Sequence, residues 1–235
     1  MARNSLKPTL NQTFRIVHDK SAKGADVEFH TALQRSRRAE EEGRWEEAAE
    51  IRFAAVQELV ALLPEDESIE LDWDDDATRE AIVLLHASAT DFFLVGDLEM
   101  AAAQLEMVLD VDGEDHLEVT PLLGFIYVAI REWDSFDDVL PDLDDKSPEK
   151  ALLLVWSGFL REGTIPSAHF AALSRYHSAY LKEWCAVAHP ADQEYRSAIT
   201  SERPSKEALA RGLWLQTEHL WAAESAFLEA LRAMR

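Results

Sequence analysis

Among the residues of this chain that could do chemistry, Cys185 and His189 have the spacing best suited to a metal. Four residues apart, they would share one face of a helix, and thiolate and imidazole groups are preferred ligands of zinc. A structural zinc site needs four ligands, and no second pair lies nearby in the sequence. We therefore expect a buried cysteine beside a histidine at a helix end, and no metal.

Two acidic runs begin like a calcium-binding loop. The first, Asp72–Asp76, alternates carboxylates, but Ala77 replaces the glycine of the sharp turn and Val83 replaces the closing bidentate Glu. The second, Asp110–Glu114, has Pro121 at the closing position. Neither run has the ligands needed to close around calcium.

Two histidines, His169 and His177, lie eight residues apart near Tyr176 and Tyr180. This spacing favours a packed aromatic surface over an active site. The sequence has no glycine-rich phosphate loop and no GxSxG nucleophile motif. We expect no enzymatic activity and no cofactor.

The net charge of -22 is concentrated in one part of the chain. Between Glu65 and Glu149 there are 26 acidic residues and three basic ones, whereas the remainder is close to neutral. Such a surface repels nucleic acid and anionic lipid, and it attracts a basic protein or peptide. Simple solvation of exposed faces is the alternative explanation.

Length and composition indicate a folded protein of a reducing compartment. With 235 residues and 47% apolar content, the chain can bury a sizeable core. Cys185 is the single cysteine, so an internal disulfide is excluded. No run is long enough to span a membrane, and the polar N-terminus lacks the apolar core of a signal peptide. We expect a cytoplasmic location.

Apolar residues recur at helical spacing on both sides of Gly96-Asp97, which predicts two antiparallel helices within Ala81–Leu109. A single pair of this size cannot bury its apolar face, so further pairs should stack against it. The pattern predicts helices over Asp26–Gly43 and Trp45–Pro64, His116–Ile130 and Trp133–Leu143, and Pro148–Leu160 and Pro166–Ala188, with a short piece at Ala191–Ile199.

Two segments fall outside this helical pattern. Residues 1–25 form a lead-in in which Thr13–Val17 is either flexible or a short helix. The segment Glu65–Asp76 carries eight carboxylates and no cation, and it predicts an acidic inserted loop over about 64–77. Because long polar loops cost little entropy to shorten, we expect deletion of residues 68–75 to leave the fold intact.

The residues around the turns resemble the tetratricopeptide repeat family. Its motif places Leu-Gly and an aromatic on the first helix and small, aromatic and small residues on the second. The positions that carry the resemblance are Leu123, Gly124 and Tyr127; Phe92, Gly96, Asp97, Leu98, Ala101, Leu105 and Val108; Gly43, Trp45, Ala48 and Ala55; and Trp214, Ala223, Phe227 and Ala230. Arg52 stands where a second-helix aromatic is expected.

Turn spacing supports the resemblance. The turns at Gly43, Gly96, Arg131 and Gly163 are separated by 53, 35 and 32 residues, against a family repeat of about 34. The first interval fits once the acidic insertion is removed. The resemblance implies an all-α fold, a right-handed array of antiparallel helix hairpins over residues 26–235. A generic bundle of helical hairpins is the alternative.

In this family the ligand lies in a concave groove lined by the first helix of each pair. The corresponding positions here include Arg37, Val83, His86, Thr90, Phe93, Phe125 and Val128. Only Arg37 could grip a C-terminal carboxylate, so the groove would bind an apolar segment or be filled by the N-terminal stretch. Independently of the resemblance, the concentration of charge predicts an acidic flank made of Asp72, Asp74, Asp75 and Asp76.

These features favour a non-catalytic protein-binding scaffold whose partner is a protein or peptide, and the acidic block favours a basic partner. The alternatives are a cytoplasmic chaperone for an exported or assembling client, and an accessory subunit of an enzyme.

The last element, Ser205–Arg235, can be one helix or two. The family alignment places a turn near Glu218-His219, but no Gly or Pro is present there and the apolar stripe continues without a slip. The periodicity therefore favours one helix of about 30 residues that begins at the N-cap Ser205. Such a helix would expose Leu220 and Phe227 and invite a homodimer.

Overall fold

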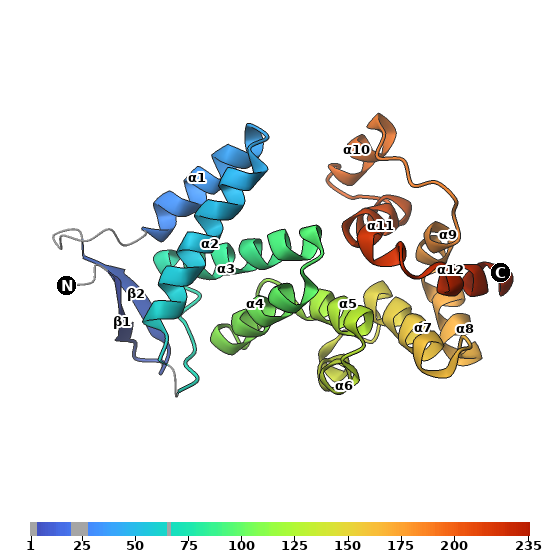
Figure 1. Ribbon diagram of the computed structural model, residues 1–235, viewed down its shortest axis with the longest axis horizontal. Helices are drawn as coiled ribbons and strands as arrows, with labels where there is room; N and C mark the ends of the chain where they lie inside the picture. Colours follow the sequence, from blue (N-terminus) through green and yellow to red (C-terminus); the bar gives the residue numbers. More distant parts are fainter. Residues whose placement is uncertain (1–3, 20–27, 65–66) are drawn as a thin grey trace. The chain divides into compact units, whose positions relative to one another are not determined.

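The computed structural model describes residues 4–19, 28–64 and 67–235, and in them it contains twelve α-helices, one short 3-10 helix and one two-stranded sheet (Figure 1). The fold is mostly helical, which confirms the all-α expectation. No helix among these residues is long and apolar enough to cross a membrane. The chain divides into two compact units, Met1–Leu123 and Gly124–Arg235, which are described separately.

Unit 1 contains two antiparallel helix hairpins. Its helices are α1 (Phe29–Glu41), α2 (Trp45–Leu62), α3 (Asp76–Val95) and α4 (Leu98–Val111), and α5 (Thr120–Ile130) begins in this unit. Helix α3 packs against α4, α2 and α1. The hairpin predicted around Gly96-Asp97 is therefore present, with Asp97 as the N-cap of α4.

Side-chain contacts show that α1 and α3 run parallel. His30 of α1 contacts Glu80 of α3 at 2.7 Å near the start of both helices. Near their ends, Arg52 of α2 pairs with Glu40 of α1 and Asp91 of α3. Both hairpin turns therefore lie at the same end of unit 1, as expected for stacked hairpins (Figure 1).

Three turns, at Gly43, Gly96 and Arg131, share one backbone geometry. Their φ angles are +73°, +84° and +63°, all in the left-handed region. In each turn this residue donates its N–H to the carbonyl three positions back, and the next residue donates to the carbonyl five positions back. This is the Schellman pattern that ends many helices. The turns are repeated units at the level of hydrogen bonding, even where arginine replaces glycine.

The N-terminal segment is a β-hairpin, which contradicts the short-helix and flexible-segment predictions. Strands β1 (Asn4–Pro8) and β2 (Phe14–His18) pair antiparallel, with Leu6 opposite Ile16. The alternation in β2 buries Ile16, whose N–H donates to the hydroxyl of Thr78 at the start of α3 at 2.9 Å. The apolar-polar run was thus a strand signal of period two. Residues 1–3 and 20–27 lie outside the described residues.

The acidic loop forms backbone hydrogen bonds with strand β2 of this sheet. Phe14 donates its N–H to Glu70 O and accepts from Asp72 N, both at 2.8 Å, and Leu71 donates to Val111 O at 2.8 Å. Leu71 is only 2% exposed. These contacts argue against the expectation that the loop can be deleted, because its backbone joins β2 to the end of α4. Glu65 and Asp66 lie outside the described residues.

Unit 2 contains the rest of α5 and the remaining helices. These are α6 (Trp133–Val139), the 3-10 helix η1 (Leu140–Asp142), α7 (Pro148–Glu162), α8 (Ser167–Tyr176), α9 (Ser178–Trp184), α10 (Gln193–Ile199), α11 (Lys206–Trp221) and α12 (Ser225–Ala233). The single helix predicted over 166–188 is broken at His177. Helix α8 packs against α7, whereas α9 packs against α11.

The C-terminal element is two helices, so the single-helix prediction is wrong. Ser205 caps α11 by accepting from Ala208 N, as expected, but the helix ends at Trp221. The chain then turns so that α12 packs against α7, and the fully buried Phe227 reaches the ring of Trp156. Leu220 is buried as well. Both residues belong to the protomer's own core, which removes the reason to expect a homodimer through them.

Two glycines are required by close packing. A Cβ at Gly124 would lie 2.8 Å from Leu153 Cδ1, and one at Gly158 would lie 2.5 Å from Pro166 Cγ. Gly124 thus seats Leu153 of α7 against its backbone, and Gly158 seats Pro166, which follows at the turn of its own hairpin.

We expect Gly158→Ala to lower the free energy of unfolding by about 1–3 kcal/mol, because the rigid proline ring cannot move away from the new methyl group. Urea unfolding followed by circular dichroism measures the change. Gly113→Ala is the control, since nothing lies within 4 Å of a Cβ there. Equal effects of the two substitutions would contradict this account.

The Leu71 side chain should contribute like a core residue despite its place in an acidic loop. Leu71→Ala is expected to cost about 2–5 kcal/mol of unfolding free energy through lost burial and a residual cavity. Ile69→Ala, at a half-exposed position in the same loop, should cost clearly less. A loss for Leu71→Ala no larger than for Ile69→Ala, measured by urea unfolding, would show that the loop is not anchored through Leu71.

Candidate functional site

The groove positions proposed on α1 and α3 have different surroundings. Arg37 is exposed, and Val83, His86 and Thr90 are half-buried, so these four side chains reach the surface of unit 1. Phe93 is completely buried. Burial lowers the pKa of His86, so its imidazole is neutral at pH 7. Phe93 is thus a core residue and not part of a groove.

The two groove positions proposed on α5 are also core residues. Phe125 and Val128 are 1% and 0% exposed, and the Phe125 ring packs against Trp156 and Trp221. Nearly every residue of α5 is apolar, so periodicity could not show which face turns inward. The expectation that these side chains contact a ligand is corrected on this ground.

Sequence reasoning noted Arg52 only as a departure from the repeat motif, yet its buried guanidinium joins three helices of unit 1. Its carboxylate partners are Glu40 on α1 and Asp91 on α3. Burial raises the pKa of Asp91, while the hydrogen bond from Arg52 opposes that rise. The sequence did contain a signal for this ion-pair network, since Arg52 stands where the repeat motif expects an aromatic packing residue.

Three of the four carboxylates of the acidic flank have local structural roles. Asp75 caps α3 by accepting from Thr78 N at 3.0 Å, and Asp72 accepts from Asp74 N at 3.2 Å. Asp76 forms an ion pair with Arg79. The spacing that resembles a calcium loop is therefore a turn followed by a helix cap. In the part of the chain that the structure describes, no group of three or more His, Cys, Asp or Glu residues could hold a metal ion.

The acidic loop also contacts the segment after α4, because Trp73 of the loop stacks on His116 of that segment. The Trp73 ring lies 4.6 Å from the His116 ring, with an angle of 5° between the planes. His116 Nδ1 is 2.6 Å from Asp112 Oδ1. The hydrogen bond to Asp112 raises the pKa of His116, and Glu114 and Asp74 act in the same direction.

An open groove of about 500 Å³ lies between the end of α2, the acidic loop and the end of α4. We call it the α2–α4 groove. Its walls include Val60, Leu63, Ile69 and Met107, together with the carboxylates of Glu67 and Asp110. None of the described residues that line it carries a positive charge. The groove therefore combines apolar walls with a negative rim, and it lies beside the predicted acidic flank.

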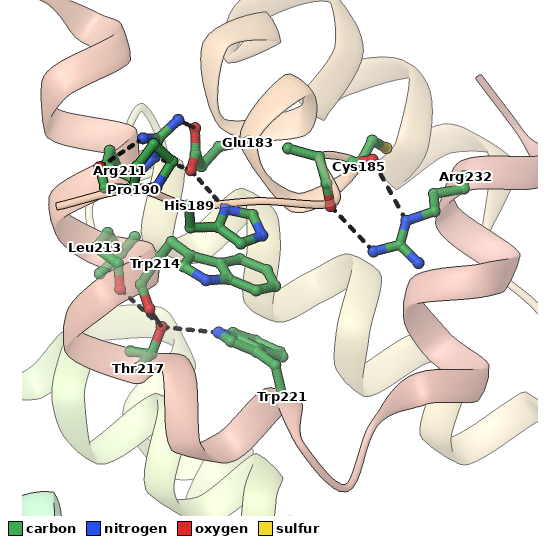
Figure 2. Close-up of polar contacts among 11 residues, drawn as sticks. Glu183, Cys185, His189, Pro190, Arg211, Leu213, Trp214, Thr217, Trp221 and Arg232 are labelled. Carbon is green, nitrogen blue, oxygen red and sulfur yellow. Dashed lines mark hydrogen bonds and ion pairs between the residues drawn. The ribbon is translucent and has the colours of Figure 1, made fainter. Parts of the chain in front are cut away.

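In unit 2, His189 belongs to a structural cluster with Glu183 and Trp214, whereas the Cys185 carbonyl accepts from Arg232 at 3.3 Å in a separate contact (Figure 2). Helix α9 ends at Trp184, so Cys185 and His189 do not share a helix face. Cys185 is buried as expected, and burial raises the pKa of its thiol. The His189 ring stacks on Trp214 with 3.9 Å between centroids.

The charged part of this cluster is Glu183, which is buried and accepts from two elements. His189 Nδ1 lies 2.7 Å from Glu183 Oε1, and the Arg211 guanidinium binds the same carboxylate. Arg211 also donates to Pro190 O at 3.0 Å (Figure 2). The cluster holds the segment after α9 against α11, which is a structural role.

Comparison with known proteins yields no match among family models, curated proteins or solved structures. The resemblance to tetratricopeptide repeats therefore stands on the turn and packing residues of this chain. The candidate surfaces must likewise be judged on their own chemistry.

The His116 pKa makes stability depend on pH in a definite direction. A histidine whose folded pKa lies above its unfolded value stabilises the fold below the unfolded pKa of about 6.5, and this contribution disappears as the pH rises through the folded pKa. His116→Gln should therefore cost more stability at about pH 5.5 than at about pH 8.5. Lost stacking on Trp73 is nearly the same at both pH values, so it cancels in the difference.

Urea unfolding of both proteins at the two pH values measures this difference, and an NMR titration of His116 measures the pKa itself. A titration midpoint at or below about 6.5 would contradict the assignment.

Proposed function

We propose that this protein is a non-catalytic scaffold that binds a protein segment in the α2–α4 groove. The observation that carries the proposal is the composition of the groove: its walls are apolar and come from three elements, and its described lining residues include carboxylates but no cation. Grooves of this kind take amphipathic segments whose apolar side chains enter while polar ones stay at the rim.

The charge of the groove specifies the partner further. Glu67 and Asp110 line the groove beside its apolar walls, and both belong to the acidic block of the sequence between Glu65 and Glu149. A segment with two or three apolar side chains beside Lys or Arg complements both properties. Complementary charge mainly accelerates encounter and selects the partner, while apolar burial supplies affinity.

The repeated turns at Gly43, Gly96 and Arg131 support the further proposal that the hairpins form a tetratricopeptide-like right-handed array. In such an array, Arg37, Val83, His86 and Thr90 would lie on the concave face and could extend the binding surface. A cytoplasmic location belongs to the same proposal and rests on the absence of cysteine pairs from the sequence.

A non-catalytic role is supported by the use that the fold makes of its most reactive side chains. The Cys185 thiol is held in its protonated form by burial, and His189 is occupied by Glu183 and Trp214. Both residues are accounted for by packing and ion pairing.

The proposal is tested by selecting peptides from a random display library on the purified protein. Enriched peptides should combine apolar residues with Lys or Arg, and raising salt from about 50 to about 300 mM should slow their association more than it speeds their dissociation. Met107→Lys, inside the groove, should weaken binding by about tenfold or more, because it places a cation against both the apolar wall and the basic peptide.

Met100→Lys is the matched control, since Met100 is an exposed methionine on the same helix that does not line the groove. Acidic consensus peptides, or equal losses for the two lysine variants, would overturn the assignment of the groove. Enriched peptides that are sensitive to Val83→Lys instead would move the binding surface to the concave face.

A further inference from the structure

Unit 2 contains a second, chemically different cavity, of about 540 Å³, near the first residues of α7, α9 and α11. Its lining includes Lys146, His177 and Lys206, the rings of Tyr176 and Tyr180, and the side chain of Leu209. Cavities of about 300–1,000 Å³ are typical of sites for small molecules. This cavity shares no lining residue with the α2–α4 groove, so a ligand bound in it is independent of the proposed function.

The cavity is positive within a strongly acidic chain. Among the described residues, neither the Lys146 nor the Lys206 ammonium group forms an ion pair. Asp145 also lines the cavity, but its carboxylate pairs with Lys150 at 2.6 Å, and that hydrogen bond lowers the pKa of Asp145. Two lysines thus remain available to a bound anion, in a chain that has 23 basic residues against 45 acidic ones.

A hydroxyl at the wall of the cavity is available for the same ligand. Tyr180 is 8% exposed and lines the cavity, and its hydroxyl has no hydrogen-bond partner among the described residues. Burial, assisted by Glu149, raises the pKa of Tyr180 to about 12. The phenol therefore stays protonated at neutral pH and can donate a hydrogen bond. The hydroxyl oxygen is not fully buried, so a ligand in the cavity can reach it.

The remaining walls are apolar. The Tyr176 ring and Leu209 are 62% and 43% exposed, and Pro148 also lines the cavity. The Arg175 guanidinium carbon lies over the Tyr176 ring, 5.2 Å from its centroid. Such walls suit a flat apolar group attached to the anion, because they remove its surface from water.

From the two unpaired lysines, the unpartnered Tyr180 hydroxyl and the apolar walls, we infer that this cavity binds a small organic anion. The ligand carries a phosphate or dicarboxylate group held by Lys146 and Lys206, accepts a hydrogen bond from Tyr180, and places an apolar body against Tyr176 and Leu209. A cavity of this size encloses one such molecule, which favours a small ligand over an acidic protein segment.

Isothermal titration of the full chain with phenyl phosphate tests the inference, with benzylsuccinate as the dicarboxylate probe and phenol as the neutral one. At least one anion should bind with a millimolar or lower Kd, and phenol should not bind measurably. The tighter of the two anions identifies the charged group. An NMR titration should also show the His177 imidazole pKa rising on binding, since burial and Lys206 lower it in the free protein.

Variants show where the anion binds. The pair Lys146→Gln and Lys206→Gln should together weaken binding by about tenfold or more, and Tyr180→Phe, which removes only the hydroxyl, by a few-fold. Lys182→Gln is the matched control, because Lys182 is an exposed lysine on α9 that does not line the cavity. Circular dichroism of each variant establishes that the helices are intact.

The inference would be overturned by a lack of saturation with either anion up to about 10 mM. It would also be overturned if Lys182→Gln weakened binding as much as the cavity variants, since the anion would then follow overall positive charge. Binding of an acidic peptide with no binding of either small anion would assign the cavity to a protein partner and exclude the small-ligand inference.

Discussion

The ion pairs of Arg52 are the interaction on which the arrangement of unit 1 depends. One buried guanidinium binds Glu40 at the end of α1 and Asp91 at the end of α3, so it sets the two helices parallel and in register. Replacing Arg52 would leave the partly exposed Glu40 and Asp91 carboxylates without their shared cation. The shared end of the Gly43 and Gly96 turns follows from this register.

The acidic loop both carries negative charge and makes contacts that hold it in the fold. Leu71 and the backbone of Phe14 tie the loop to β2 and α4, and Trp73 stacks on His116. Asp75 and Asp76 cap and pair within the first turn of α3. Since the loop is held in place, its neighbouring carboxylates present a fixed negative rim to the α2–α4 groove. An unanchored insertion of the same composition would provide charge but no defined surface.

Unit 2 is organised around four buried tryptophans. The Trp221 ring of α11 contacts the rings of Trp156 of α7, Trp184 of α9 and Trp214 of α11, and Phe227 of α12 packs against Trp156 and Trp221. Burying rings from several helices requires the chain to break after Tyr176 and again after Trp221. The first of these breaks also places His177 and the start of α9 at the wall of the basic cavity.

The sequence by itself determined the helical class, the positions of most helix pairs, the turns at Gly43 and Gly96 and the Ser205 cap. These features depend on local periodicity, on left-handed backbone geometry and on capping, all of which are encoded within a few residues. The charge of the α2–α4 groove could also be anticipated, because acidic composition needs no fold to be recognised.

Tertiary structure alone decided which apolar faces turn inward, as at Phe93, Phe125 and Phe227, because a side chain's burial depends on elements far away in sequence. It also decided that Thr13–Val17 pairs as a strand and that Leu71 anchors the acidic loop. The basic cavity could not be read from the sequence, since Lys146, Tyr180 and Lys206 meet only when three helix starts converge.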